Sequence, residues 1–212
     1  MEIPFINIHT HQNNSQGIVI SYSETESLLP TEGIHPWRVE EHPEEQLLLL
    51  EQQLISNSIV AIGESGLDRV HKETFQQQQV WFEKQLQLAK KYNKPVIIHC
   101  VKAYADMIPF FKQNPSLSFI LHGYNGNSIT TKQLMKYSVY FSFGKSFMQD
   151  HAKTMESFLY LPTDRIFLEN DESDFSIASI YEKAAQTKQM DLIQLKERIF
   201  ANYNQLFGTW NG

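Results

Sequence analysis

Short runs of apolar residues alternate along the chain with longer segments whose apolar residues recur every three or four positions. The short runs are rich in β-branched and aromatic residues and predict strands. They cover residues 5–8, 59–63, 95–98, 118–121, 139–143 and 166–168, with less regular extended segments at 18–22 and 29–34. The longer segments predict helices, most clearly over residues 44–56 and 74–92, and residues 177–206 read as packing helices. The chain therefore has a βα pattern.

The predicted strands are apolar along their whole length, as in Val96-Ile97-Ile98, which is typical of parallel strands buried on both faces. Repeated βα units of this kind favour a TIM-type (β/α) barrel. We expect one domain over residues 1–212, since no linker rich in Gly, Ser or Pro divides the chain. Residues 11–33 are polar and show no helical pattern, so the barrel is expected to be distorted or incomplete, without its first crossover helix.

Residues that bind metals stand at the ends of five predicted strands. His9 and His11 alternate at the end of the first strand, so their imidazoles should face the same side. Four later strands end in, or are soon followed by, another such residue: Glu64, His99, His122 and Asp171. The C-terminal ends of barrel strands share one face, which brings all six side chains to one mouth.

Taken singly, each of these residues is explained as well by a helix cap or a buried polar group. Together, four imidazoles and two carboxylates at one mouth would be left unsatisfied without a cation. The set predicts a metal centre. Its nitrogen and oxygen ligands favour Zn²⁺, Mn²⁺ or Fe over Ca²⁺, and exclude a structural site built from cysteines. Cys100 should point away from the side on which His99 lies, and we expect a packed thiol there.

The charge balance limits the classes of partner. Lys and Arg number 18 and Asp and Glu 24, a net charge of −6, which argues against broad attachment to nucleic acid or anionic lipid but allows a small basic site. The single cysteine cannot form an internal disulfide, and no segment resembles a signal peptide or a membrane span. We expect a cytoplasmic protein that does not engage membranes, with a monomer as the default state.

The order and spacing of several segments resemble the TatD-like family of metal-dependent hydrolases, the TatD DNase family. The similarity runs almost end to end. The matching segments are FINIHTH at 5–11, GIHP at 33–36, AIGESGLD at 61–68, residues 78–89 with PVIIHC at 95–100, His122 with Gly126, LPTDRIFLEND at 161–171 and NYNQLFG at 202–208.

The resemblance implies an amidohydrolase-like, distorted TIM-type barrel that hydrolyses phosphodiester bonds in DNA through one or two divalent metal ions, such as zinc, magnesium or manganese. It implies that His9, His11 and Asp171 hold one metal, that His99 and His122 hold the second, and that Glu64 bridges them. A metal-activated water would attack the phosphate, with Asp171 as base and Glu64 as the second catalytic group.

Resemblance also implies residues on the substrate side. His35 resembles a substrate-side histidine, although the flanking Pro36-Trp37 suits a plain turn equally well, and Asp68 resembles a group near the site, although capping a turn explains it equally well. Arg69 or Lys102 would supply a point charge for a phosphate. The chain departs from the family pattern where Asn7 replaces Asp, where Val101 replaces Arg or another polar group, and where Glu172 replaces Pro. It is also shorter than usual. The substrate is therefore expected to be DNA or another phosphorylated molecule.

Two alternatives remain open. A metal-dependent amide or ester hydrolase acting on a small molecule would use the same barrel and the same His-x-His start, although no lysine ends a middle strand to act as a carbamylated bridge. A non-catalytic relic that binds metal for stability would explain the shortened loops and the missing arginine. The intact ligand set weighs against that second alternative.

Overall fold

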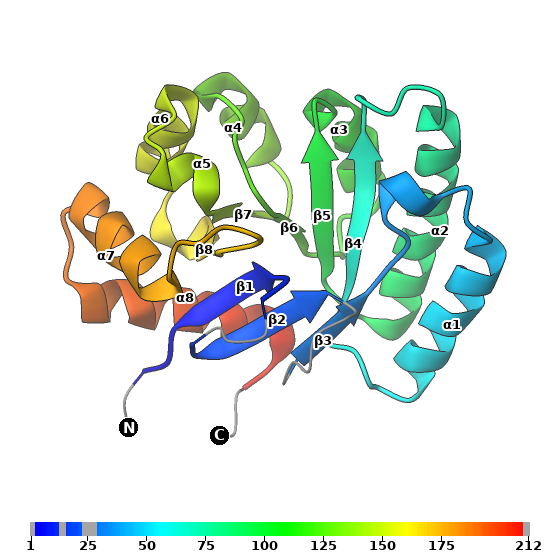
Figure 1. Cartoon of the computed structure of the whole chain (residues 1–212), viewed down its shortest axis with the longest axis horizontal. Coiled ribbons are helices and arrows are strands. Elements are labelled where there is room, and N and C mark those ends of the chain that lie inside the picture. The colour runs from blue at the N-terminus through cyan, green and yellow to red at the C-terminus, as the bar shows by residue number, and fades with distance from the viewer. Residues whose placement is uncertain (1–2, 13–15, 23–28, 210–212) are drawn as a thin grey trace.

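The computed structural model describes residues 3–12, 16–22 and 29–209 (Figure 1). Its strands form one sheet in chain order, and each pairs in parallel with the next. They are β1 Ile6–Thr10, β2 Ile18–Tyr22, β3 Leu29–Glu32, β4 Ala61–Asp68, β5 Val96–Val101, β6 Phe119–Leu121, β7 Val139–Phe143 and β8 Ile166–Leu168. The α/β prediction is confirmed.

Helices cover the outside of this sheet (Figure 1). They are η1 Pro36–Arg38, α1 Pro43–Ile55, α2 Phe75–Tyr92, α3 Tyr104–Gln113, α4 Ser128–Leu134, α5 Lys145–Met148, α6 Ala152–Tyr160, η2 Thr163–Arg165, α7 Ile177–Lys188 and α8 Leu192–Phe207. α2 shows why they form: Phe82, Leu86 and Ala89 recur on one buried face, and Asn93, in the left-handed conformation, ends the helix. Within the described ranges, no helix is long and apolar enough to cross a membrane.

The barrel is nearly closed. β1 and β8 do not form a ladder; instead, Asp171 N donates to His9 O at 3.2 Å, and Thr10 bridges to Asp171 in parallel. Below this bridge, Asn7 Nδ2 donates to Asn170 Oδ1 at 2.8 Å. The predicted distorted TIM-type barrel is confirmed, with its distortion at this seam and in the first connections.

The link from β1 to β2 is too short for a crossover helix. Ile18 follows Thr10 by eight residues, yet the two strands pair in parallel. Seven linking residues reach about 23 Å when extended, enough to return along a strand of about 17 Å. The missing first crossover helix is thus explained, although residues 13–15 and 23–28 of the polar stretch lie outside the described part of the chain.

Two strand boundaries were predicted wrongly. β4 continues to Asp68 and β5 to Val101, so Glu64 and His99 lie inside strands and not at their ends. The main chain keeps pairing beyond the polar residues, as the partners Gly66 with His99 and Asp68 with Val101 show. Polar side chains mark where a strand reaches the barrel mouth, whereas main-chain pairing decides where the strand ends.

Candidate metal centre

A bulge in β4 positions Glu64. Between Ile62 and Ser65 the strand advances three residues while β5 advances two, which breaks the alternation of sides. Gly63 makes this possible: its φ is +152°, and a Cβ there would lie 2.5 Å from Ile97 O. The bulge leaves the Glu64 side chain buried in the barrel mouth, only 5% exposed.

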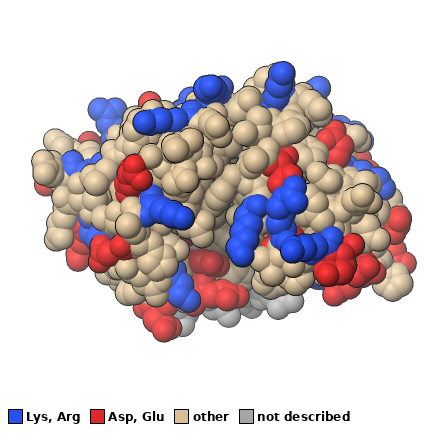
Figure 2. Space-filling model, turned by 90° about the horizontal axis from the view of Figure 1, so that it is seen from above, with Lys and Arg blue, Asp and Glu red and all other residues tan. Residues whose placement is uncertain are grey.

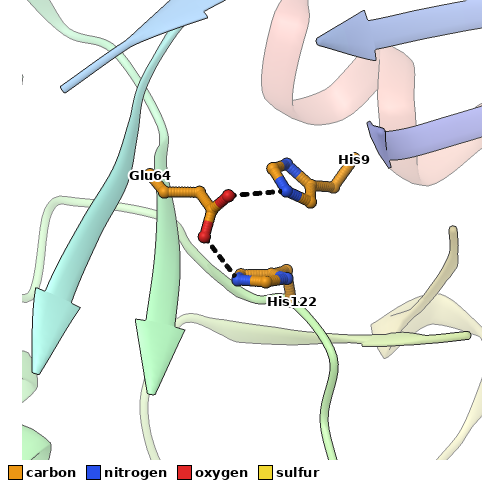
Figure 3. Close-up of side chains that lie close together, drawn as sticks. All are labelled: His9, Glu64 and His122. Carbon is orange, nitrogen blue, oxygen red and sulfur yellow. Dashed lines mark ion pairs between the residues drawn. The ribbon is translucent and has the colours of Figure 1, made fainter. Parts of the chain in front are cut away.

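Four imidazoles surround the Glu64 carboxylate. Oε1 lies 2.9 Å from His9 Nε2 and 3.0 Å from His11 Nε2. Oε2 lies 2.9 Å from His122 Nε2 and 3.3 Å from His99 Nδ1. Figure 3 shows His9 and His122 approaching the two oxygens from different segments of the chain: His9 lies on β1, and His122 directly follows β6. One carboxylate oxygen thus faces each pair of histidines.

Asp171 completes the cluster from the other side of the barrel seam. Its Oδ1 lies 3.6 Å from His11 Nε2 and 3.7 Å from His9 Nε2. A left-handed backbone at Asp171, with φ of 49°, turns the chain out of the β8 direction, and the bond from its N–H to His9 O fixes it beside β1. The structure therefore brings together all six predicted metal ligands.

The ring nitrogens test whether a cation fits. Among the described residues, several imidazole nitrogens are buried without a hydrogen bond: Nε2 of His9, Nε2 of His99 and both ring nitrogens of His122. Of these, Nε2 of His9 and Nε2 of His122 each lie 2.9 Å from a Glu64 oxygen. Two tetrahedral ligands each about 2.0–2.1 Å from a zinc ion are themselves about 3.3 Å apart. The separations of 2.9–3.3 Å around Glu64 are close to that value. The residues fit a divalent cation.

The acid–base properties of the cluster follow from burial and mutual charge. Burial alone would raise the pKa of Glu64, but the imidazoles, His122 and His9 foremost, hold it well below its ordinary value. Burial opposes the protonation of His122, yet the charges of Glu64 and Glu169 raise its pKa well above the usual range. For Asp171, burial and then the charge of Glu169 raise the pKa.

Glu169 is a member of this cluster that sequence reasoning missed. Its side chain is 1% exposed, its Oε1 lies 3.6 Å from His122 Nδ1, and the same oxygen accepts a hydrogen bond from Gly123 N at 2.6 Å. It stands two residues before Asp171, the spacing that places side chains on one side of an extended chain. That spacing was the available signal.

His35 and Asp68 lie at the rim of the centre. His35 Nε2 is 3.5 Å from Glu64 Oε2, and burial lowers the pKa of this histidine. Asp68 Oδ2 is 3.6 Å from His99 Nε2 and accepts a hydrogen bond from Trp37 Nε1, while Oδ1 accepts one from Val70 N. Asp68 thus caps a turn and also supports the site. Trp37, which bridges these residues, was given no role by the sequence.

Arg69 and Lys102 lie outside the ligand cluster. Arg69 forms a two-point ion pair with Asp106 through Nε and Nη2. Both Arg69 and Lys102 line a pocket next to the metal centre.

Cys100 packs against the hydrophobic core, and burial raises its pKa, in keeping with the expected packed thiol.

The cluster opens into a cavity of about 320 Å³ lined by His11, His35, Trp37, His99 and Asp171 among others. Seen from above, the molecule is hollowed at its centre, with acidic side chains at the lower edge of the hollow and Lys and Arg side chains along its right wall (Figure 2). A substrate can therefore reach the ligands from this face.

Comparison with known proteins identifies related chains. The family model described as TatD related DNase matches residues 3–208. An uncharacterized metal-dependent hydrolase of Haemophilus influenzae is 33% identical over 154 residues, which cover 68% of this chain and 59% of that protein. The 3'-5' ssDNA/RNA exonuclease TatD of Edwardsiella piscicida is 27% identical over 92% of this chain and 83% of its own length.

Structural comparison agrees on the fold. The crystal structure of YjjV, a TatD homolog from Escherichia coli, superposes with a TM-score of 0.87 at 20% identity, covering 99% of this chain and 100% of that one. The hydrolase TatD family protein of Entamoeba histolytica gives a TM-score of 0.82 at 18% identity, over 99% and 100% of the two chains. In sequence, this chain spans only 56–59% of the length of metal-dependent hydrolases such as those of H. influenzae and Bacillus subtilis.

Proposed function

The chain belongs to the family of TatD-related DNases, and from that premise we propose that it is a metal-dependent hydrolase that cleaves phosphodiester bonds in single-stranded nucleic acid. The observation that carries the proposal is the set of buried imidazole nitrogens without hydrogen bonds around Glu64. A barrel mouth with this donor set is suited to metal-assisted hydrolysis. The substrate class rests on the E. piscicida exonuclease, which aligns over most of this chain.

Two cations fit the division of the ligands. His9, His11 and Asp171 would hold one on the side of Glu64 Oε1, and His99 with His122 would hold the other on the side of Oε2. Glu64 would bridge them. Zinc, manganese or magnesium bound there acidifies water and neutralises charge on the phosphate oxygens.

The protein side chains supply the remaining parts of the mechanism. Asp171 is about a third exposed at the cavity, so a water molecule can reach its carboxylate and transfer a proton to it. Glu169 orients His122 from behind the ring. The Trp37 indole packs edge-on near His35 and His99, which fixes the rim on the side of η1.

We also propose that residues 1–212 form a single hydrolase domain.

The test is elemental analysis of protein purified without chelator, combined with turnover of bis-p-nitrophenyl phosphate and of a labelled single-stranded oligonucleotide. We expect two equivalents of metal and cleavage of both substrates. Glu64→Ala should lose cleavage and reduce bound metal, because the Glu64 carboxylate faces both pairs of histidines. Glu45→Ala, at an exposed position on α1, is the matched control and should change neither.

Other outcomes would favour the alternatives. Metal binding with turnover of a carboxylic ester or an amide, and none of phosphodiesters, would indicate the small-molecule hydrolase. Bound metal without turnover of any of these substrates would indicate a relic.

A further inference from the structure

A second pocket, of about 840 Å³, lies beside the metal centre over the β4–α2 and β5–α3 connections. Its lining includes Arg69, Lys72, Phe75 and Lys102. We propose that this pocket, called here the basic pocket, binds a phosphate of the nucleic acid strand at least one nucleotide away from the bond that is cleaved. The inference rests on the proposed function and adds to it a second binding site, for a phosphate that is not itself cleaved.

The basic pocket adjoins the metal centre along two paired strands. Arg69 directly follows Asp68, whose Oδ2 lies 3.6 Å from the ligand His99. Lys102 directly follows β5, three residues after His99, and Arg69 N donates to Val101 O at 3.0 Å. We therefore expect a nucleic acid strand whose scissile phosphate lies at the metal centre to reach the basic pocket over the ends of β4 and β5.

The charges in the basic pocket suit an anion. The pocket is lined by the cations Arg69, Lys72 and Lys102 and by one carboxylate, Glu73. Asp106 pairs with Arg69, so the excess of positive charge comes from the two lysines. Lys72 and Lys102 are exposed and form no ion pair within the part of the chain that the structure describes. Because the whole chain carries a net charge of −6, such a cluster is a local exception. Figure 2 shows Lys and Arg side chains gathered along the right wall of the hollow.

Arg69 is held in place before any ligand binds. Its Nε and Nη2 donate to Asp106, and its guanidinium stacks over the Phe75 ring at 4.4 Å from the centroid. A guanidinium carries five N–H donors, so donors beyond those engaged by Asp106 can meet a phosphate. Fixing the side chain beforehand lowers the entropy lost on binding.

An exposed aromatic ring, that of Trp37, lines the metal-centre cavity and approaches His71, the residue before Lys72. The Trp37 side chain is 58% exposed although it donates to Asp68, and its ring lies 5.7 Å from His99 and 5.3 Å from His71. Bases of single strands stack on exposed aromatic rings of this kind. An exposed indole beside a group of cations suits a nucleotide, whose base can stack on the ring while its phosphates meet the cations. A free small anion has no base to stack on the indole.

The test uses the double variant Lys72→Gln/Lys102→Gln and a matched control, Lys90→Gln/Lys112→Gln. The control removes the same charge from exposed lysines in the last turns of α2 and α3, the helices that Lys72 and Lys102 precede. Binding of a fluorescent octathymidylate with cleavage-resistant phosphorothioate linkages is measured by anisotropy on the protein as purified, at several salt concentrations. Turnover of bis-p-nitrophenyl phosphate is measured in parallel.

We expect the Lys72/Lys102 variant to bind the octamer about tenfold more weakly, with the slope of log K against log salt shallower by about 0.7 for each lost contact. The control should bind normally, and turnover of bis-p-nitrophenyl phosphate should stay unchanged in both variants. Unchanged octamer binding, or an equal loss in the control, would overturn the inference. So would thymidine monophosphate binding with the same lysine dependence and affinity as the octamer, which would indicate a site for free small anions.

The two proposals fail separately. If the wild-type protein does not cleave bis-p-nitrophenyl phosphate but binds the octamer through these lysines, the proposed function is wrong and the basic pocket stands. If the wild-type protein cleaves bis-p-nitrophenyl phosphate but binds the octamer no better than the double variant does, the inference about the basic pocket is wrong and the proposed function stands.

Discussion

Glu169 lies directly behind His122: its Oε1 is 3.6 Å from Nδ1, while Glu64 approaches the Nε2 side of the same ring at 2.9 Å. The imidazole is thus held between two buried carboxylates. A carboxylate behind a metal-binding histidine fixes the ring orientation and raises its basicity as a ligand. The pair therefore connects Glu169, which directly follows β8, to the metal centre.

Glu169→Gln should weaken metal binding about 10- to 100-fold, because the neutral amide loses the charge that supports His122. The substitution keeps an acceptor for Gly123 N, so the fold should remain. Titration calorimetry with Zn²⁺ or Mn²⁺ measures the effect. Glu197→Gln, at an exposed position on α8, serves as control. Equal metal affinity in Glu169→Gln and the wild type would remove Glu169 from the site.

Removing the metal should lower stability. The ligands are gathered only in the folded chain, so a bound cation stabilises that state, by about 2.7 kcal/mol at a free concentration 100 times Kd. We expect a lower melting temperature after exhaustive chelation, with recovery on adding Zn²⁺ or Mn²⁺. In Glu64→Ala most of this difference should disappear. An unchanged melting temperature after chelation would indicate that the cluster holds no metal.

Much of the fold and of the ligand set could be predicted because each depends on local sequence pattern. The apolar runs gave the strands, and parallel strands share one mouth, so His9, His99 and His122 were predicted to meet there. The mutual geometry could not be predicted. The β4 bulge depends on pairing with a strand more than 30 residues away, and it needs Gly63 because φ is positive there and because Ile97 O lies so near.

Other features escaped prediction because they depend on partners distant in the sequence. Arg69 was expected to supply a point charge for a phosphate, but its position was not predicted: Asp106 on α3, 37 residues away, and the Phe75 ring hold it in the pocket beside the metal centre. Trp37 appeared to belong to a plain turn, and only the folded chain places its indole against Asp68. Hydrogen bonds between such distant residues leave no periodic signal.

The contribution of Lys188 to stability should rise between about pH 8 and pH 10. Burial lowers the pKa of Lys188 to about 8, whereas the unfolded chain has the ordinary value near 10.4. Between these values the unfolded chain binds more protons at this site, so its contribution to the free energy of unfolding increases with pH, by at most about 1 kcal/mol after solvent screening. Cys100 contributes with the opposite sign, because burial raises its pKa. The Lys188 contribution is therefore measured as the difference between the urea midpoints of the wild type and of Lys188→Met at pH 7, 8, 9 and 10, which should grow in favour of the wild type as the pH rises. The difference for Lys153→Met, on the exposed side of α6, should not change with pH. A constant difference for Lys188→Met would show that Lys188 does not titrate in this range.

The last prediction concerns the seam, where the fully buried Asn7 on β1 faces Asn170 after β8. Asn7 Nδ2 donates to Asn170 Oδ1 at 2.8 Å, and Asn170 N donates back to Asn7 Oδ1 at 3.2 Å. Asn170 Nδ2 in turn donates to Gln12 Oε1, whose own amide donates to Ser173 O. The amides therefore form a directed chain, in which each orientation fixes the next.

This chain explains the departure from Asp at position 7. A carboxylate there would place an acceptor against the acceptor Asn170 Oδ1, and flipping the Asn170 amide would move the same conflict to Gln12. We expect Asn7→Asp to lower the free energy of unfolding by about 1–3 kcal/mol, the cost of leaving a buried polar group unsatisfied. Asn7→Ala and Asn170→Ala should each cost a similar amount, and the double variant should cost less than their sum because both remove the same pair. Denaturant titrations of the four proteins at pH 7 give the coupling energy. Additive losses would mean that the two amides stabilise the fold independently, and that the seam is held by the main-chain bond from Asp171 to His9 alone.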